Sequence, residues 1–175
     1  MAKLSSLDDL LVHEMKDVYD AEHQILKALP KMIDATSTPE LQNAFQLHLQ
    51  QTEGHVRRLE EAFRLLGKEA KREKCAGMAG IIAEGEKMMG ENMEPGVADA
   101  AIIAAAQKVE HYEIASYGCL ATYAEMLGYN QVHDLLGQNL SEEEATDEKL
   151  TALAESLVNV EAERGAGGQP GKRTH

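Results

Sequence analysis

The stretch DAAIIAAAQKVEHYEIASY, residues 99–117, gives the strongest indication of how this chain folds. Its Ala-rich first half predicts a helix that packs closely against other helices, because small side chains let two backbones approach. Glu110 and Glu113 nevertheless lie close to the same apolar face of this helix. A helix that buries two carboxylates needs a partner for their charge.

Around this stretch, apolar residues recur at helical spacing and the alternation typical of strands is absent, which predicts an all-α fold. We expect a shorter amphipathic helix within residues 78–92, on the long connection between the second and third long helices. A single long crossover at this place is the ferritin-like form of a four-helix bundle. The first long helix is expected to begin at Ser5 or Ser6 and to be kinked by Pro30 near its end. The other three are expected from Thr38 to Gly67, from just after Pro95 and Gly96 to Gly128, and from Asn130 to Val160.

Composition limits the class of protein. With 175 residues, of which 43% are hydrophobic, the chain is expected to form one domain, residues 1–163. Residues 164–175 have no large apolar side chain to bury, and we expect them to form a disordered tail. A net charge of −13 argues against a nucleic-acid partner. Without a signal-like or membrane-spanning segment, and with Cys75 and Cys119 read as free thiols, we expect a cytoplasmic protein.

Each long helix carries a polar interruption near its middle, at a position that helical geometry places on or beside the apolar stripe. Taken alone, a Glu on such a stripe more often lies at an edge with its carboxylate in water, and an acidic run such as SEEEATDEK is usually a solvated face. Their coincidence at similar depth on four helices favours a shared site. The residues are Glu22, His48, Glu110, Glu113, Glu143 and Asp147.

Several carboxylates in one core cost several kcal/mol each unless something compensates them. Protonation, pairing with Arg or Lys, and a bound cation are the three possibilities. No Arg or Lys occupies the corresponding interior positions. A pair of metal ions would neutralise the cluster and turn its repulsion into coordination, and carboxylate ligands suit iron or manganese.

Four segments of the chain resemble a known family. The segments LVHEMKDVYDAEHQILKALPKM, CAGMAGIIAEGE, DAAIIAAAQKVEHYEIASYG and EEEATDEKLTALA are similar to the bacterial YciE/YciF group, over roughly residues 4 to 160. That group is a ferritin-like family associated with stress response. The resemblance implies a ferritin-like bundle, commonly a homodimer, with a candidate dimetal centre like that of rubrerythrins.

The sequence departs from the usual ferritin-like ligand pattern, a Glu on each of two helices and Glu-x-x-His on each of the other two. The fourth helix has Glu144 and Asp147 where the pattern has Glu and His, and both therefore join the candidate ligands. On the second helix, Thr52 stands where a Glu would precede His55. We therefore expect this half of the site to be weakened.

Three functions follow as hypotheses. The first is a metal-binding protein whose Fe or Mn pair reacts with oxygen or peroxide, with Tyr19, Tyr112 and Tyr117 near the centre or in core packing. The second is a non-catalytic iron-handling protein, which requires a cage. The third is a structural or interaction dimer whose polar core fixes the register of the helices and whose metal is incidental.

Overall fold

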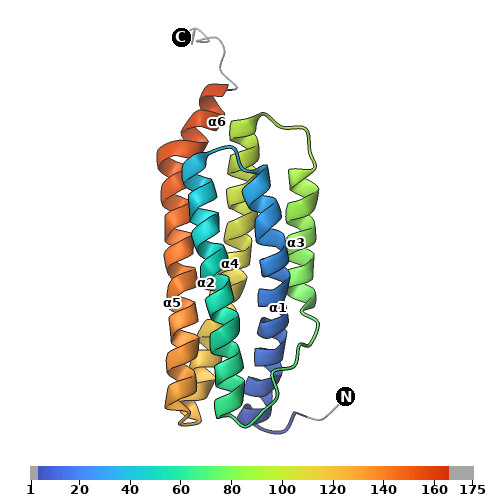
Figure 1. Ribbon diagram of the computed structural model, residues 1–175, viewed down its shortest axis with the longest axis vertical. Helices are drawn as coiled ribbons and strands as arrows, with labels where there is room; N and C mark the ends of the chain where they lie inside the picture. The colour runs from blue at the N-terminus through green and yellow to red at the C-terminus, as the bar shows by residue number, and fades with distance from the viewer. Residues whose placement is uncertain (1–3, 166–175) are drawn as a thin grey trace, which may run out of the picture.

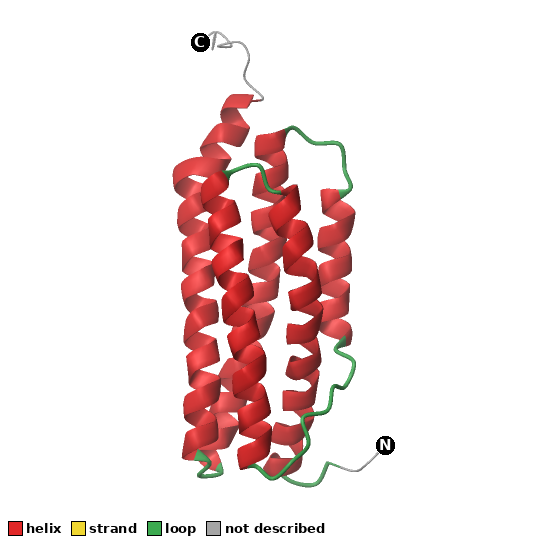
Figure 2. Ribbon diagram, viewed as in Figure 1, coloured by secondary structure: helices red, strands yellow, loops and turns green. Residues whose placement is uncertain are grey.

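A computed structural model describes residues 4–165, and among these every regular element is a helix (Figure 2). The all-α prediction is confirmed. No helix in this described part combines the length and the apolar character needed to cross a membrane. The helices are α1 (Leu7–Ala35), α2 (Pro39–Leu65), α3 (Ala76–Met89), α4 (Pro95–Met126) and α5 (Asn130–Leu153), which continues through a π-helical turn (Ala154–Val158) into α6 (Asn159–Gly165).

The four long helices α1, α2, α4 and α5 form an elongated bundle, and α3 lies outside it against α1 and α4 (Figure 1). Helices α1 and α2 form one antiparallel pair, and α4 and α5 form the other. Between the pairs, the chain returns along the whole bundle through residues 66–75 and α3, so that α4 runs in the same direction as α2. This is the single long crossover of a ferritin-like bundle, as predicted.

The helix ends follow the capping signals in the sequence. Ser6 caps α1, since its side-chain oxygen accepts a hydrogen bond of 3.1 Å from the Asp9 amide. Gly67 and Gly128 follow α2 and α4 with φ angles of 64° and 77°, which is the left-handed conformation that glycine adopts at low cost. Both stops were expected at these glycines.

Two boundaries differ from the expectation. Pro95 and Gly96 do not end the preceding element but begin α4, because proline suits the first turn of a helix. Pro30 lies inside α1 near its end, as expected, and the helix ends at Ala35. Helix α6 extends through Gly165, two residues into the expected tail, and the rest of that tail, residues 166–175, lies outside the described residues.

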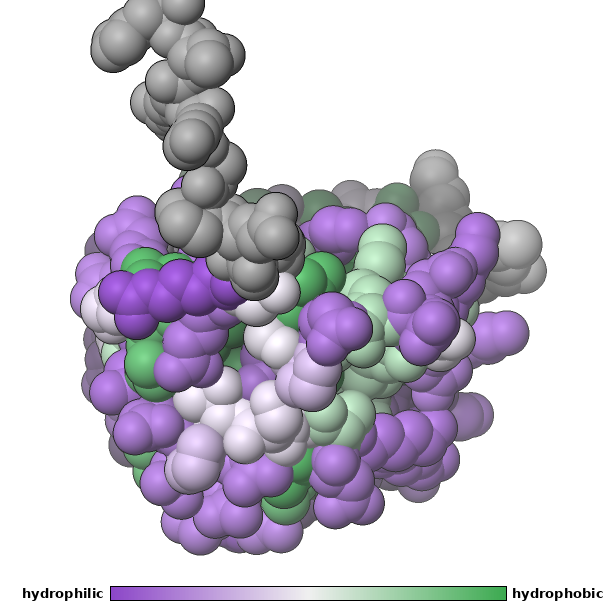
Figure 3. Space-filling model, turned by 90° about the horizontal axis from the view of Figure 1, so that it is seen from above, coloured by the Kyte–Doolittle hydropathy of each residue, from purple (hydrophilic) through white to green (hydrophobic). Residues whose placement is uncertain are grey.

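The apolar core is divided into two clusters, one toward each end of the bundle, and this division positions the site between them. One cluster is built on Ile25, Phe45, Ile102 and Leu150, and the other on Leu11, Leu59, Tyr117 and Leu136. Figure 3 looks onto the end of the bundle where α1 meets α2, and shows hydrophilic residues around the rim with apolar residues between them. The polar interruptions of the long helices lie at mid-height, where neither cluster closes the core.

The α1–α2 loop is anchored on α4 by a buried carboxylate. Asp99, 0% exposed, accepts hydrogen bonds from the amide and hydroxyl groups of both Ser37 and Thr38, at 2.6 to 2.9 Å. Thr38 therefore precedes α2 without capping it, because its hydroxyl is turned to Asp99.

Replacing Asp99 with Ala removes the acceptor of all four bonds and leaves their donors at least partly unsatisfied. We expect Asp99→Ala to lower the free energy of unfolding by about 2 kcal/mol or more, measured by urea denaturation of the metal-free protein. The exposed Glu91 provides the control, and Glu91→Ala should change the value by less than about 0.5 kcal/mol. Equal values for the two variants would show that the Asp99 network does not stabilise the loop.

Candidate metal centre

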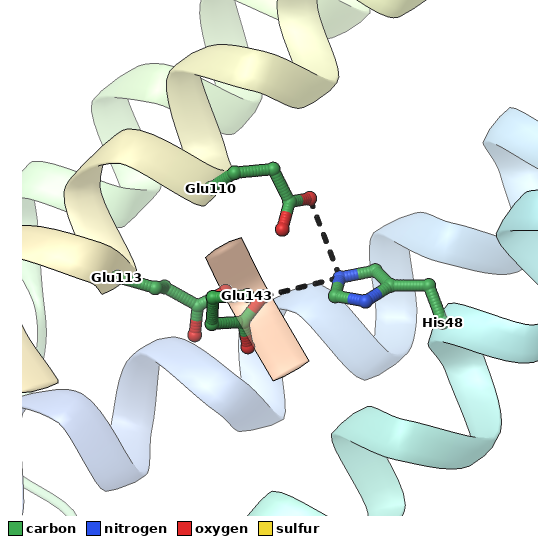
Figure 4. A group of neighbouring side chains, drawn as sticks. All are labelled: His48, Glu110, Glu113 and Glu143. Carbon is green, nitrogen blue, oxygen red and sulfur yellow. Dashed lines mark ion pairs between the residues drawn. The ribbon is translucent and has the colours of Figure 1, made fainter. Parts of the chain in front are cut away.

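Six buried side chains from the four long helices meet at mid-height in the bundle. All are 0 to 2% exposed. They are Glu22 on α1, His48 and His55 on α2, Glu110 and Glu113 on α4, and Glu143 on α5. Figure 4 shows His48, Glu110, Glu113 and Glu143 directed toward one another from three helices.

The six residues form two groups that share Glu143. His48, Glu110, Glu113 and Glu143 each place one donor atom within 4.8 Å of the others, and Glu22, His55 and Glu143 do the same. The two oxygens of Glu143 face different histidines: Oε1 lies 2.8 Å from His55 Nδ1, and Oε2 lies 3.9 Å from His48 Nε2. A carboxylate in this position is placed to bridge two cations.

His55 is oriented by a charged pair outside the centre. Its Nε2 lies 2.9 Å from Glu142 Oε2, and Arg58 binds both oxygens of Glu142 at 2.6 and 3.1 Å. Although burial acts in the other direction, Arg58 holds the pKa of Glu142 below its ordinary value, so Glu142 is ionised and accepts the Nε2 proton. In the neutral imidazole this leaves the lone pair on Nδ1, which faces Glu22 and Glu143.

His48 is oriented by a hydroxyl group. The Thr146 hydroxyl donates to the backbone carbonyl of Glu142 at 2.9 Å, and its oxygen lies 3.3 Å from His48 Nδ1. Because that hydroxyl proton is already used, Thr146 accepts the proton of Nδ1. The lone pair of His48 is therefore on Nε2, 3.4 Å from Glu110 Oε1. His48 thus presents a free ring nitrogen to the centre, and His55 would do so once its Nδ1 proton has left.

Charge in the metal-free centre is reduced by shifted pKa values. Burial raises the pKa of Glu22, and burial together with the charge of Glu143 raises the pKa of Glu110 and Glu113 well above the ordinary value. Glu143 is the exception: burial acts to raise its pKa, but its contacts with His55, His48 and Glu110 together outweigh burial and lower it. The centre therefore holds protons where its carboxylates crowd together.

The histidines differ in charge. Burial lowers the pKa of His48, which favours its neutral form. Burial acts in the same direction on His55, but its bonds to Glu143 and Glu22 outweigh it and raise the pKa of His55 to about 10. His55 is therefore a cation in the metal-free protein at neutral pH.

The donor set fits metal ions. Eight side-chain atoms of these six residues are buried and lack a hydrogen bond of good geometry within the described chain, among them both oxygens of Glu113 and of Glu143. Buried polar atoms are otherwise almost always satisfied. Four carboxylates and two imidazoles form the ligand set of dinuclear iron and manganese proteins, and cations would satisfy these atoms together.

Two predicted ligands lie outside the centre. Glu144 is exposed, because one residue rotates the helix by about 100° and Glu143 occupies the inward direction. Asp147, 20% exposed, lies at the rim, where it accepts a hydrogen bond from Gln107 and pairs with the exposed His111. The other five predicted residues converge.

His55 was missed as a ligand. The ferritin-like pattern has a Glu three residues before each histidine, and Thr52 occupies that position before His55. The available signal was the distance of seven residues from His48, which is about two helical turns and places both rings on one face of α2. The converging set of four carboxylates and two histidines matches the usual ferritin-like pattern in number, but here both histidines come from α2 and two of the glutamates from α4.

Comparisons with known proteins agree with this architecture. Residues 6–163 match the family described as "Domain of unknown function (DUF892)". Protein YciF of Escherichia coli K12 is 46% identical over 164 residues, covering 93% of this chain and 99% of that protein. The crystal structure of E. coli YciF, described as a stress protein, has a TM-score of 0.86 and covers 89% of this chain and 99% of its own.

Two further structures share the fold. YcfI from Rhodopseudomonas palustris is 42% identical, with a TM-score of 0.83 over 85% of this chain and 95% of that one. A protein of Xanthomonas campestris, with 20% identity and a TM-score of 0.73 over 92% of this chain and 99% of its own, shows the fold alone.

The contact between Glu142 and His55 gives a first prediction for the centre. Glu142→Gln keeps an acceptor for the Nε2 proton but removes the charge, so we expect Mn²⁺ affinity to fall by about tenfold. The neighbouring Glu144→Gln removes the same charge from an exposed position and should leave affinity within about twofold of wild type. Isothermal titration at fixed pH and ionic strength measures both. A larger loss for Glu144→Gln would mean that Glu144 is a ligand after all.

Protonation gives a second prediction. A metal ion must displace protons from His55, whose pKa is about 10, and from Glu110 and Glu113, whose pKa values are raised. Binding therefore releases protons, and Mn²⁺ affinity should increase with pH between about pH 6 and pH 8. Titration in two buffers of different ionisation enthalpy counts the protons released. An affinity independent of pH would contradict these protonation states.

Proposed function

The chain belongs to the DUF892 family, and we propose that it is a metal-binding protein with a dinuclear iron or manganese centre that reacts with oxygen or peroxide in the bacterial stress response. The observation that carries this proposal is the position of Glu143 between two groups of buried donors. One carboxylate shared by two sets of ligands has no role in a simple core, where an apolar residue would pack at lower cost.

Charge and ligand type favour these metals. Four ionised carboxylates carry four negative charges, which two divalent cations balance without any further group. The carboxylate oxygens favour hard cations, and the two imidazoles favour iron or manganese over magnesium or calcium. When bound, such a pair would supply the electrons that reduce an oxidant.

The residues of this chain would hold and shield that pair. Glu22 and His55 would hold one ion, His48, Glu110 and Glu113 the other, and Glu143 both. Tyr117 donates its hydroxyl proton to Glu22 and is fully buried, which fixes one ligand and keeps a phenol beside the centre. The two apolar clusters exclude water above and below.

We also propose a cellular role, a location and an assembly for the protein. E. coli YciF is described as a stress protein, and 46% identity over nearly its whole length supports the same setting here. We propose a cytoplasmic homodimer with metal ions as its partners and no nucleic-acid or membrane partner. Size measurement in solution would distinguish a dimer from the cage that an iron-handling protein requires.

A structural role is the second candidate, since one has been suggested for YcfI. In that case the buried polar residues would fix the alignment of the helices, and any metal would be incidental. The ion pair of Arg58 and Glu142, which continues to His55, is the contact that favours this alternative.

Metal content tests the proposal. After anaerobic reconstitution with Fe²⁺ and desalting, we expect about two ions per chain by mass spectrometry, and none firmly retained in Glu143→Gln because both groups lose their shared ligand. The exposed neighbour variant Glu144→Gln should retain two. A wild-type protein that retains no ions would favour the structural role.

Stability with and without metal separates a ligand from a packing residue. Burial and the charge of Glu143 raise the pKa of Glu110 and so favour its neutral form without metal, and Glu110→Gln should therefore leave the melting temperature within about 2 °C of wild type. With metal at 100 times the dissociation constant, wild type should gain about 2.7 kcal/mol, and the variant should gain much less. Equal destabilisation in both conditions would identify Glu110 as a structural residue.

A further inference from the structure

A narrow apolar cavity lies between α1, α3 and α4 and ends at the candidate centre. Its walls are mainly aliphatic, with Ile25 and Leu29 from α1, Ile82 from α3 and Val109 from α4 among them. At its inner end lie His48 and Glu110, two residues of the same group in the centre. The cavity therefore connects the face under α3 with the ligands of one proposed ion.

The size of the cavity restricts what it can hold. The space that the centre of a water-sized molecule can occupy is about 30 Å³. A single water needs about 10 to 15 Å³ by this measure, so there is room for about two molecules of that size. An organic substrate does not fit, whereas a diatomic gas does.

The aliphatic lining of the cavity restricts which small molecules can enter it. A polar molecule such as water or hydrogen peroxide would give up hydrogen bonds along aliphatic walls, which costs about 1 to 3 kcal/mol or more for each group left unpaired. Dioxygen makes no such bonds and gains dispersion contacts instead. The wall thus discriminates against the polar oxidant and in favour of the apolar one.

The cover of the cavity is loosely held. Met78 is the one residue of α3 that is buried, and exposed ion pairs of 2.7 Å tie α3 to the bundle, from Lys31 to Glu86 and from Lys108 to Glu84. Such exposed pairs contribute about 0 to 1 kcal/mol each. Small outward movements of α3 are therefore inexpensive and would admit a gas molecule.

We propose that this cavity binds dioxygen and conducts it to the centre, which makes dioxygen, rather than peroxide, the oxidant that the fold favours. This inference rests on the proposed metal function for its purpose, but the cavity itself can be tested without metal.

Xenon is a suitable probe, because it occupies dry apolar cavities of this kind. In crystals of the metal-free protein under xenon pressure, we expect an anomalous peak between α1, α3 and α4. Ala28 lines the cavity and is half-buried, so Ala28→Leu should fill the space and remove the peak. Ala104→Leu, on the exposed side of α4, adds the same side chain elsewhere and should keep it. A wild-type cavity without xenon would overturn the proposal.

A second variant, in which the cavity is enlarged, keeps the test decisive if Ala28→Leu does not fold. Ile82→Ala removes three carbon atoms from the wall that α3 contributes, and it should raise xenon occupancy while Ala28→Leu lowers it. Unchanged occupancy in both variants would place the xenon site elsewhere and overturn the proposal.

Kinetics then connect the cavity to the centre. In the iron-loaded protein, the iron pair would supply two electrons and become diferric, the solvent would supply two protons, and dioxygen would leave as hydrogen peroxide. We expect the second-order rate constant for oxidation by dioxygen to fall about tenfold in Ala28→Leu, with unchanged iron content, and to stay at the wild-type value in Ala104→Leu. Oxidation by added peroxide should change less than about twofold.

The outcomes separate the two proposals. Iron that binds and is oxidised at equal rates in wild type and Ala28→Leu would overturn the dioxygen route and leave the metal function standing. Failure to bind iron would overturn the metal function and, with it, the delivery of dioxygen to a metal, whatever the xenon result.

Discussion

Repulsion among carboxylates buried in one core is the constraint on which the rest of the structure depends. Glu110, Glu113 and Glu143 have donor atoms within 4.8 Å of one another. At that distance, two ionised carboxylates repel by about 3.5 kcal/mol with an effective dielectric constant of about 20. Three such pairs would use most of the roughly 5 to 15 kcal/mol that holds a domain folded. Full ionisation therefore requires counter-charge, and the metal-free chain meets the need with protons on glutamates and a cationic His55.

The side of the centre toward α2 and α5 differs in polarity from the side toward α1 and α4. Toward α2 and α5, Arg58 and Glu142 form a charged pair that orients His55 and remains partly exposed to water. Toward α1 and α4, aliphatic walls lead inward to His48 and Glu110. The two approaches to the centre therefore differ in polarity, since one is charged and the other is mainly apolar.

The sequence predicted the fold better than the site, for a physical reason. Apolar spacing and glycine stops act locally, so Gly67 and Gly128 were placed correctly. Pro95 was ambiguous, since the same residue can follow one helix or begin the next. The start of α4 approaches α6 closely, since a Cβ on Gly96 would lie 3.2 Å from Ala162. This contact helps to hold the start of α4, and no local sequence pattern contains it.

At the site, the kind of residue was easier to predict than which member of each run of polar residues turns inward. Glu143 and Glu144 are adjacent in an acidic run, and only packing against the other helices decides which one turns inward. His55 was overlooked because a fixed Glu-x-x-His spacing was expected. Thr146, three residues after Glu143, occupies the position where that spacing would place a histidine, and its hydroxyl lies against the ring of His48 from α2.

The crossover gives this bundle an asymmetry that four helices alone would not have. A bundle with short loops would expose the α1–α4 face directly to solvent, and water would then reach His48 and Glu110. The chain instead lays α3 along that face, where Ile81, Ile82 and Met89 pack against the core. Because α3 contributes little burial of its own, it closes the face against bulk water without sealing it rigidly. The long connection that makes the topology ferritin-like is therefore also the element that shapes access to the centre.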